Sequence, residues 1–145
     1  MGVHDFSINP KIEDLKNLEK PSESEVLEAV KTLLRWTGDN PDRDGLKDTP
    51  KRVLKAYGEW FKGYDENPTT LLSKTFEEVK GYNDWVVLDS IRVESYCEHH
   101  LAPIIGVAKV GYLPDGLVVG ISKLVRVVNA YSKRLQIQER LTREI

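Results

Sequence analysis

The chain has 145 residues, of which 40% are hydrophobic and 30% are charged, and its formal net charge is −2. This size and composition are typical of a globular domain with a hydrophobic core. The charge argues against a dedicated nucleic-acid-binding protein, although a local basic pocket is compatible with it. The single cysteine excludes an internal disulfide and fits a reducing compartment. Neither a signal peptide nor an apolar run of transmembrane length is recognisable, so we expect a cytoplasmic protein with no membrane partner.

The N-terminal part predicts a loose arm followed by a helix. Residues 1–20 are polar, rich in lysine and glutamate, and only weakly periodic. The sequence Ser-Glu-Ser-Glu at 22–25 has the form of a capping box. Apolar residues then follow at helical spacing until Gly38, which predicts the end of the helix.

A second helix is expected to begin at Thr-Pro, residues 49–50, where a capping hydroxyl precedes a proline. Its apolar stripe predicts an end at Gly63. Arg52 and Lys55 share one face, and their spacing alone indicates an ordinary solvated basic face. Residues 64–83 hold a Pro-Thr-Thr-Leu-Leu piece at 68–72 and then a mixed linker.

The second half of the chain predicts a β-hairpin and more helix. Residues 85–93 and 104–112 are rich in β-branched side chains and flank a short connection, which is typical of an antiparallel hairpin. Ser122 is the expected N-cap of a long helix whose apolar stripe runs to Leu135. Residues 137–145 continue with apolar side chains at helical spacing.

The connection of the hairpin reads Cys-Glu-His-His and holds the only cysteine and two of the three histidines. Cys97 and His100, three positions apart, are able to bind one borderline cation such as zinc. The adjacent His99 would then point elsewhere and keep its imidazole for proton transfer near neutral pH. Glu98 is a candidate to orient a ligand or a water. The alternative is a small buried hydrophobe at Cys97 beside ordinary loop residues.

Further candidate binding residues follow the hairpin. Ser122, Lys123 and Arg126 combine a hydroxyl and two cations near an expected helix N-terminus, which suits an anion such as phosphate. Gln138 and Glu139 are suited to reading a nucleobase edge through an amide and a carboxylate. In both cases the alternative is an ordinary solvated helix surface.

Several motifs occur in one order along the chain. They are Thr-Pro-Lys-Arg-Val at 49–53, Cys-Glu-His-His-Leu at 97–101, Gly-Tyr-Leu-Pro at 111–114, Gly-Ile-Ser-Lys-Leu at 120–124 with Arg126, and the stretch 131–142. This combination resembles the GTP cyclohydrolase I family and covers most of residues 22–145.

The resemblance implies an α+β architecture, the tunnelling fold (T-fold). In it, N-terminal helices precede an antiparallel sheet that packs on long helices. Residues 1–83 correspond to the N-terminal arm and helical region. Residues 84–145 correspond to the first half of the tunnelling-fold catalytic domain. The resemblance also implies a homo-oligomer, a toroidal decamer with active sites at subunit interfaces.

The implied activity is the zinc-dependent hydrolytic opening of the GTP guanine ring at C8. Formate is released and 7,8-dihydroneopterin triphosphate forms, an early step of folate and pterin biosynthesis. Cys97 and His100 match zinc ligands. His99, Glu98 and Ser122 match catalytic-site residues, with His99 as the acid–base histidine. The positions that match substrate-binding residues are Arg52, Lys55, Lys123, Arg126, Gln138 and Glu139.

The chain also departs from the family pattern. That pattern continues into two more strands and a helix, and a His-x-Cys element there supplies a third zinc ligand and a second catalytic histidine. Because Cys97 is the only cysteine here, we interpret the chain as truncated. We expect residues 1–145 alone to bind zinc weakly and to turn over no GTP. Two alternatives stay open: another tunnelling-fold enzyme acting on a pterin or deazaguanine, and a truncated, non-catalytic assembly subunit.

Overall fold

The computed structural model describes residues 18–77, 82 and 84–145, so most of the predicted N-terminal arm lies outside the described residues. The chain divides into two compact units, with the boundary between Lys55 and Ala56. The predicted functional division at residue 83 falls within the second unit and stays a prediction. Among the helices of the described residues, none has the length and apolar character that crossing a membrane requires.

The first predicted helix is confirmed as α2 (Glu23–Trp36), and its capping box is formed. The Ser22 N–H donates to Glu25 Oε2 at 2.8 Å, and the Glu25 N–H donates to Ser22 Oγ at 3.4 Å. The helix gives way to Thr37 and then to Gly38, whose φ of +90° suits a residue without a Cβ. Local sequence therefore determines both ends of α2.

The second predicted helix is α3 (Thr49–Trp60). Thr49 is its first helical residue rather than a cap outside it, and the helix ends before Gly63. Gly63 instead lies in a short 3₁₀ helix, η1 (Lys62–Asp65), and its N–H donates to the Lys133 carbonyl at 3.1 Å. A long-range backbone contact, rather than helix termination, explains this glycine.

The predicted linker contains regular structure. Asn67 accepts hydrogen bonds from the Thr69 and Thr70 N–H groups at the start of α4 (Pro68–Leu72). The strand β1 (Thr75–Glu77) follows and pairs antiparallel with β4 (Leu117–Val119).

The predicted hairpin is confirmed as β2 (Val86–Cys97) and β3 (Pro103–Tyr112), which pair antiparallel. The register shifts between Leu88 and Ile91, where Ser90 has a φ of 58°. This irregularity has the character of a β-bulge, which re-aims the side chains of the strand.

A short strand extends the sheet on the other side of β2. β5 (Leu135–Gln136) pairs parallel with the end of β2, which gives the order β3-β2-β5. The α+β class is therefore confirmed, and within the described residues this sheet is mixed rather than wholly antiparallel.

The long helix is shorter than predicted. α5 (Ile121–Ser132) has Gly120 as its N-cap without a side-chain hydrogen bond, so the prediction of Ser122 as the cap was wrong. Leu135 belongs to β5, because Lys133 leaves the helical conformation at φ −79° and ψ 51°. The pairing of β5 with β2 outweighs the helical periodicity at this point. α6 (Gln138–Glu144) corresponds to the last predicted segment.

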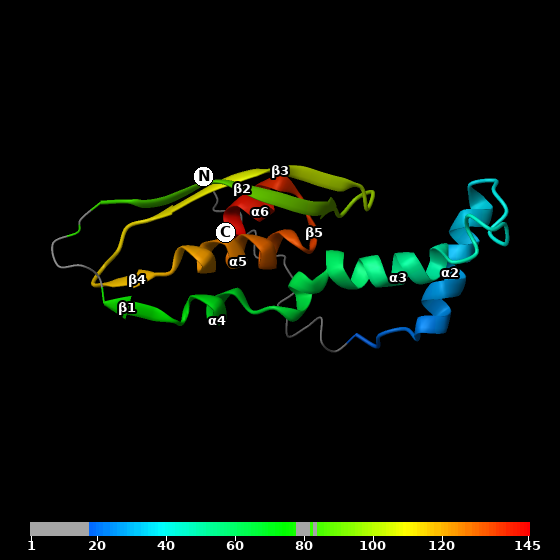
Figure 1. Cartoon of the computed structure of the whole chain (residues 1–145), viewed down its shortest axis with the longest axis horizontal. Helices are drawn as coiled ribbons and strands as arrows, with labels where there is room; N and C mark the ends of the chain where they lie inside the picture. Colours follow the sequence, from blue (N-terminus) through cyan, green and yellow to red (C-terminus); the bar gives the residue numbers. More distant parts are fainter. Residues whose placement is uncertain (1–17, 78–81, 83) are drawn as a thin grey trace, which may run out of the picture. The chain divides into compact units, whose positions relative to one another are not determined.

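The core of the second unit lies between one face of the hairpin and the helices α5 and α6 (Figure 1). Ile91 and Val93 of β2 are buried there against Val128 of α5 and Leu141 of α6. Residues between these core positions on β2, such as Arg92, are exposed. This alternation is expected of a strand with one face on the core. It fixes the orientation of β2, whose last residue is Cys97.

Candidate functional site

The candidate site begins where β2 ends, at Cys97. Its N–H donates to the Ala102 carbonyl at 2.8 Å, and its carbonyl accepts from the Leu101 N–H at 2.8 Å. Leu101 adopts a φ of 55°, which closes the turn. The connection between the strands is therefore held by its own backbone, and it presents the exposed side chains of His99 and His100.

The two imidazoles lie equally close to the thiol. Cys97 Sγ is 3.9 Å from Nδ1 of His99 and 3.9 Å from Nδ1 of His100. Zinc binds sulfur at about 2.3 Å and imidazole nitrogen at about 2.0 Å, so two such ligands on a tetrahedron lie roughly 3.5 Å apart. A thiolate and an imidazole at the observed separation fit this donor geometry. Both histidines therefore lie at a distance from the thiol that suits a second zinc ligand.

Within the described ranges, no group of three or more His, Cys, Asp or Glu residues is arranged to hold a metal. A catalytic zinc takes three protein ligands and one open position. Cys97 and one histidine therefore supply at most part of a zinc centre.

Glu98 is held from two sides. Its N–H donates to the Gln136 carbonyl at 3.1 Å, and its carboxylate forms an ion pair with Arg140. The other carboxylate oxygen, Oε1, lies 3.9 Å from Nε2 of His99. The sequence suggested Glu98 as an orienting carboxylate, and the structure places it between the histidine and α6.

An aromatic cluster supports the end of β2. Tyr96 stacks on Trp60 with ring centroids 4.9 Å apart and contacts Phe61 at 5.2 Å. Burial raises the pKa of Tyr96, with smaller contributions in the same direction from Glu94 and Tyr57. The hydroxyl next to Cys97 in sequence therefore stays neutral around neutral pH.

The predicted anion-binding residues lie elsewhere on the unit. Ser122 and Lys123 belong to the first turn of α5, whereas β5, which pairs with Cys97, follows the last turn of the same helix. Figure 1 shows these two ends of α5 apart, one beside β4 and one beside β5. At 1.5 Å per residue, ten residues of helix separate them by about 15 Å. One copy of this unit does not bring Ser122 next to Cys97.

Arg126 lines a pocket of about 310 Å³ on the side of α5. Two further cations, Lys62 and Lys133, line the same pocket together with Glu66. The concentration of positive charge around Arg126 suits an anionic group.

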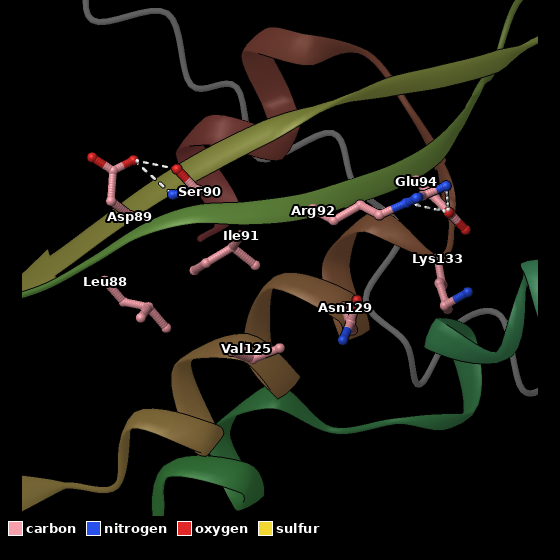
Figure 2. Close-up of a pocket in the computed structure, with 9 residues that line it drawn as sticks. All are labelled: Leu88, Asp89, Ser90, Ile91, Arg92, Glu94, Val125, Asn129 and Lys133. Atoms are coloured by element: carbon pink, nitrogen blue, oxygen red, sulfur yellow. Dashed lines mark hydrogen bonds and ion pairs between the residues drawn. The ribbon is translucent and has the colours of Figure 1, made fainter.

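A neighbouring pocket between β2 and α5 has a volume of about 430 Å³, and Figure 2 shows the residues that line it. Lys133 and Asn129 from α5 and its end line it, facing Leu88, Ile91 and the Arg92–Glu94 ion pair on β2. None of the residues predicted to bind substrate or metal is among those that line it. The candidate site therefore does not coincide with this hollow.

The predicted base-recognition residues begin α6. Gln138 and Glu139 are exposed, and Gln138 also lines a pocket of about 350 Å³ between α6 and β3. Arg140, the next residue, contacts Glu98. The structure therefore brings the start of α6 close to the Cys-Glu-His-His connection.

The remaining candidates, Arg52 and Lys55, belong to the first unit and are exposed. Arg52 forms an ion pair at 3.7 Å with Asp48, the residue just before α3. Their role in substrate binding stays a prediction.

Sequence reasoning missed Arg140 and Gln136. Both occur in the motif at 131–142, yet neither spacing nor residue type indicates that they contact Glu98. Only the parallel pairing of β5 with β2 brings them to it. The i,i+4 spacing of Gln136 and Arg140, which share a hydrogen bond of 3.0 Å, is the one local signal of their association.

Comparison with known proteins places the chain in a family. Residues 26–145 match the family model described as GTP cyclohydrolase I. A protein from Maricaulis maris named GTP cyclohydrolase 1 is 62% identical over 126 residues, which cover 87% of this chain and 62% of that protein. Proteins of the same name from Hyphomonas neptunium and Pelagibacter ubique are 57% and 55% identical and cover 89% and 93% of this chain.

This chain spans 62% to 65% of the length of these relatives. The matched region nevertheless includes the hairpin, the Cys-Glu-His-His connection, α5 and α6. The chain belongs to the GTP cyclohydrolase I family.

Proposed function

We propose that this chain carries part of the active site of a GTP cyclohydrolase I. The reaction is hydrolytic opening of the guanine ring of GTP at C8, with release of formate and formation of 7,8-dihydroneopterin triphosphate. The observation that carries the proposal is the arrangement of Cys97, His99 and His100 at the end of β2, with both Nδ1 atoms 3.9 Å from the thiol. Family membership supports the assignment of substrate.

Cys97 and His100 are the residues that would hold zinc, with a third ligand outside the described residues. When bound, zinc supplies the Lewis acidity that lowers the pKa of a coordinated water toward neutrality. His99 stands beside this pair, exposed, and is suited to donate a proton to the purine nitrogen as the ring opens. Glu98 lies 3.9 Å from His99 Nε2 and orients the imidazole.

The substrate would be held by cations at one end and by a base-reading pair at the other. Lys123 and Arg126 offer charge-assisted hydrogen bonds to phosphate oxygens, with Ser122 beside them on the first turn of α5. Gln138 and Glu139 at the start of α6 are suited to the guanine edge. Arg52 and Lys55 complete the proposed substrate-binding set.

We infer a homo-oligomer, because these groups are not all adjacent in one copy. The start of α5 is about 15 Å of helix from the end that leads to β5 and Cys97. A site that uses both needs a second copy of the chain. Exposed apolar side chains on β3 support association, since Ile105 and Val107 are 72% and 75% exposed. Native mass spectrometry measures the assembly, and a strictly monomeric protein would contradict this inference.

The function is tested in a chimera built from the Maricaulis maris relative. In it, the 126 matching residues of this chain replace the corresponding segment of the relative, and the rest of the relative is kept. We expect the zinc-loaded chimera to release formate from GTP and to form a product with pterin fluorescence. The 145 residues alone should do neither, because no group of three metal-binding side chains is arranged among the residues that the structure describes. A folded, zinc-loaded chimera that releases no formate would contradict the proposed function and favour a non-catalytic assembly subunit.

Cys97→Ala in the chimera is the matched negative variant. It should lose both the metal, measured by elemental analysis, and formate release. Retained activity in this variant would show that the thiolate is not part of the reaction site.

A further inference from the structure

The guanidinium of Arg140 joins segments that are distant in the chain. Its Nη2 pairs with the Glu98 carboxylate and also donates to the Leu135 carbonyl at 3.0 Å. Its Nε donates to Gln136 Oε1 at 3.0 Å. The side chain is 23% exposed, and that of Glu98 is 31% exposed. Arg140 thus connects α6 to β5 and to the Cys-Glu-His-His connection.

Gln136 holds Arg140 in place. Its side chain is almost fully buried, at 1% exposure. The amide nitrogen donates to the Tyr131 carbonyl at 3.0 Å and to Glu144 Oε2 at 2.7 Å, while the amide oxygen accepts from Arg140. Because both ends of this buried amide are bonded, its rotamer is fixed, and it gives Arg140 a rigid anchor.

Glu98 is consequently held at both its backbone and its side chain. The Gln136 carbonyl accepts from the Glu98 N–H at 3.1 Å, and Arg140 binds carboxylate oxygen Oε2. Oxygen Oε1 is left facing His99 Nε2 at 3.9 Å. A planar guanidinium that also donates to other fixed acceptors restricts the orientation of a bound carboxylate more than an ammonium group does.

We propose that Arg140 is a positioning residue. Together with Gln136, Arg140 fixes the position of the Glu98 carboxylate relative to the start of α6. Through Glu98, it also fixes the position of residues 98–100. This inference rests on the proposed function for its catalytic consequence, because α6 carries Gln138 and Glu139 and the connection carries His99. Arg140 itself touches neither metal nor substrate in this account.

Amide hydrogen exchange on the 145-residue chain tests the positioning directly. Arg140→Met removes the charge and the donors but keeps an unbranched side chain. We expect faster exchange, on the order of tenfold or more, at the amides of Glu98 and Leu101, because a charge-assisted contact is lost. Amides of Ile91 and Val93 in the core strand should keep their rates.

The control is Arg92→Met. Arg92 also lies on the hairpin and pairs with a carboxylate, Glu94 Oε1, at 2.6 Å, but its side chain is 76% exposed and it lies in the middle of β2, away from the connection. This variant should leave exchange in the connection unchanged. Unchanged exchange at Glu98 and Leu101 in Arg140→Met, or equal acceleration throughout β2, would overturn the proposal.

Glu98→Gln is a second variant, which changes the other partner of the contact between Arg140 and Glu98. It should also accelerate exchange at Leu101, and adding Arg140→Met to it should cause little further change, because both substitutions break the same contact. Independent, multiplicative effects of the two substitutions would contradict a shared role.

The chimera tests the catalytic consequence. Arg140→Met should lower kcat for formate release by about 10- to 100-fold, the range typical of residues that orient a catalytic group. KM for GTP should change little, and Arg92→Met should retain the parent kcat. A parent chimera without formate release contradicts the proposed function, and the exchange comparison then decides the positioning role alone. An active chimera whose kcat is unaffected by Arg140→Met overturns the inference.

Discussion

Cys97 and Gln136 are direct partners in the parallel pairing of β2 with β5. The candidate metal-binding cysteine therefore lies beside a glutamine with 1% exposure whose side chain bonds Tyr131, Glu144 and Arg140. In the three-dimensional structure, the position of the thiol depends on a residue that is 39 positions later in the sequence.

Replacing this glutamine by an apolar residue should destabilise the second unit. Gln136→Leu has a similar volume but cannot form the hydrogen bonds that the buried amide makes with the Tyr131 carbonyl and with Arg140 Nε. A buried polar group that loses its partner costs about 1–3 kcal/mol. We expect the free energy of unfolding in urea to fall by at least that amount.

Gln138→Leu is the control for this prediction. It makes the same chemical change two residues further on, at an exposed position. Exposed substitutions of this kind are usually within about 0.5 kcal/mol of the parent. Equal effects of the two substitutions would show that the bonds of Gln136 contribute nothing particular to stability.

Gly63 should not tolerate a methyl group. A Cβ at this position would lie 2.7 Å from the Lys133 carbonyl oxygen and still closer to that of Ala130, and both are backbone atoms that move little. Gly63→Ala should lower the free energy of unfolding by about 1–3 kcal/mol through overpacking. Thermal or urea-induced unfolding measures it.

Gly58 in α3 provides the opposite case, since nothing lies within 4 Å of a Cβ built there. Gly58→Ala should raise the free energy of unfolding by about 0.5–1 kcal/mol, because alanine favours a helix interior more than glycine does. A neutral Gly63→Ala would contradict the close approach of η1 to the end of α5, and a destabilising Gly58→Ala would contradict the open space around that position of α3.

The elements that the sequence predicted correctly depend on local signals. The capping box at Ser22 and the β-branched runs around Cys97 act within a few residues, so α2 and the hairpin could be predicted. The fold class followed from the family resemblance, which depends on motifs spread along the chain rather than on one local signal. The assignment of Cys97 and His100 as metal ligands stays a prediction.

The features that were missed depend on tertiary contacts. Leu135 continues the helical periodicity of α5, yet its backbone pairs with β2 and forms β5. Ser122 has a capping side chain, but the helix already begins at Ile121. The contact between Arg140 and Glu98 joins residues 42 positions apart. No local pattern encodes such a pair, so the support of the site could not be predicted.

The capping box makes the stability of α2 depend on pH. The side-chain hydrogen bond with Ser22, and then the Ser22 N–H, lower the pKa of Glu25 from its ordinary value of 4.5. Because the pKa is lower in the folded state, the stabilisation is present above about pH 4.5 and is lost as the pH falls through the folded-state value. We expect the protection factor of the α2 amide of Val26, which is its intrinsic exchange rate divided by the observed rate, to fall over this acidic range.

Glu25→Gln should remove that pH dependence, because the amide does not titrate. Glu23→Gln is the matched control, since it removes a carboxylate from the same first turn outside the capping box. It should keep the parent pH profile at Val26. A parent profile that stays flat below pH 4.5 would mean that the charge of Glu25 does not stabilise this helix end.

Substituting His99 and His100 one at a time should separate the loss of metal binding from the loss of proton transfer. Their Nδ1 atoms are equally far from Cys97 Sγ, at 3.9 Å, so the assignment of His100 as ligand and His99 as acid–base residue rests on the family resemblance. In the chimera, His100→Ala should lose most of its zinc by elemental analysis, together with formate release. His99→Ala should keep its zinc and lower kcat by about 10²- to 10⁴-fold, the usual contribution of a general acid or base. Zinc loss in His99→Ala with zinc retained in His100→Ala would reverse the two roles.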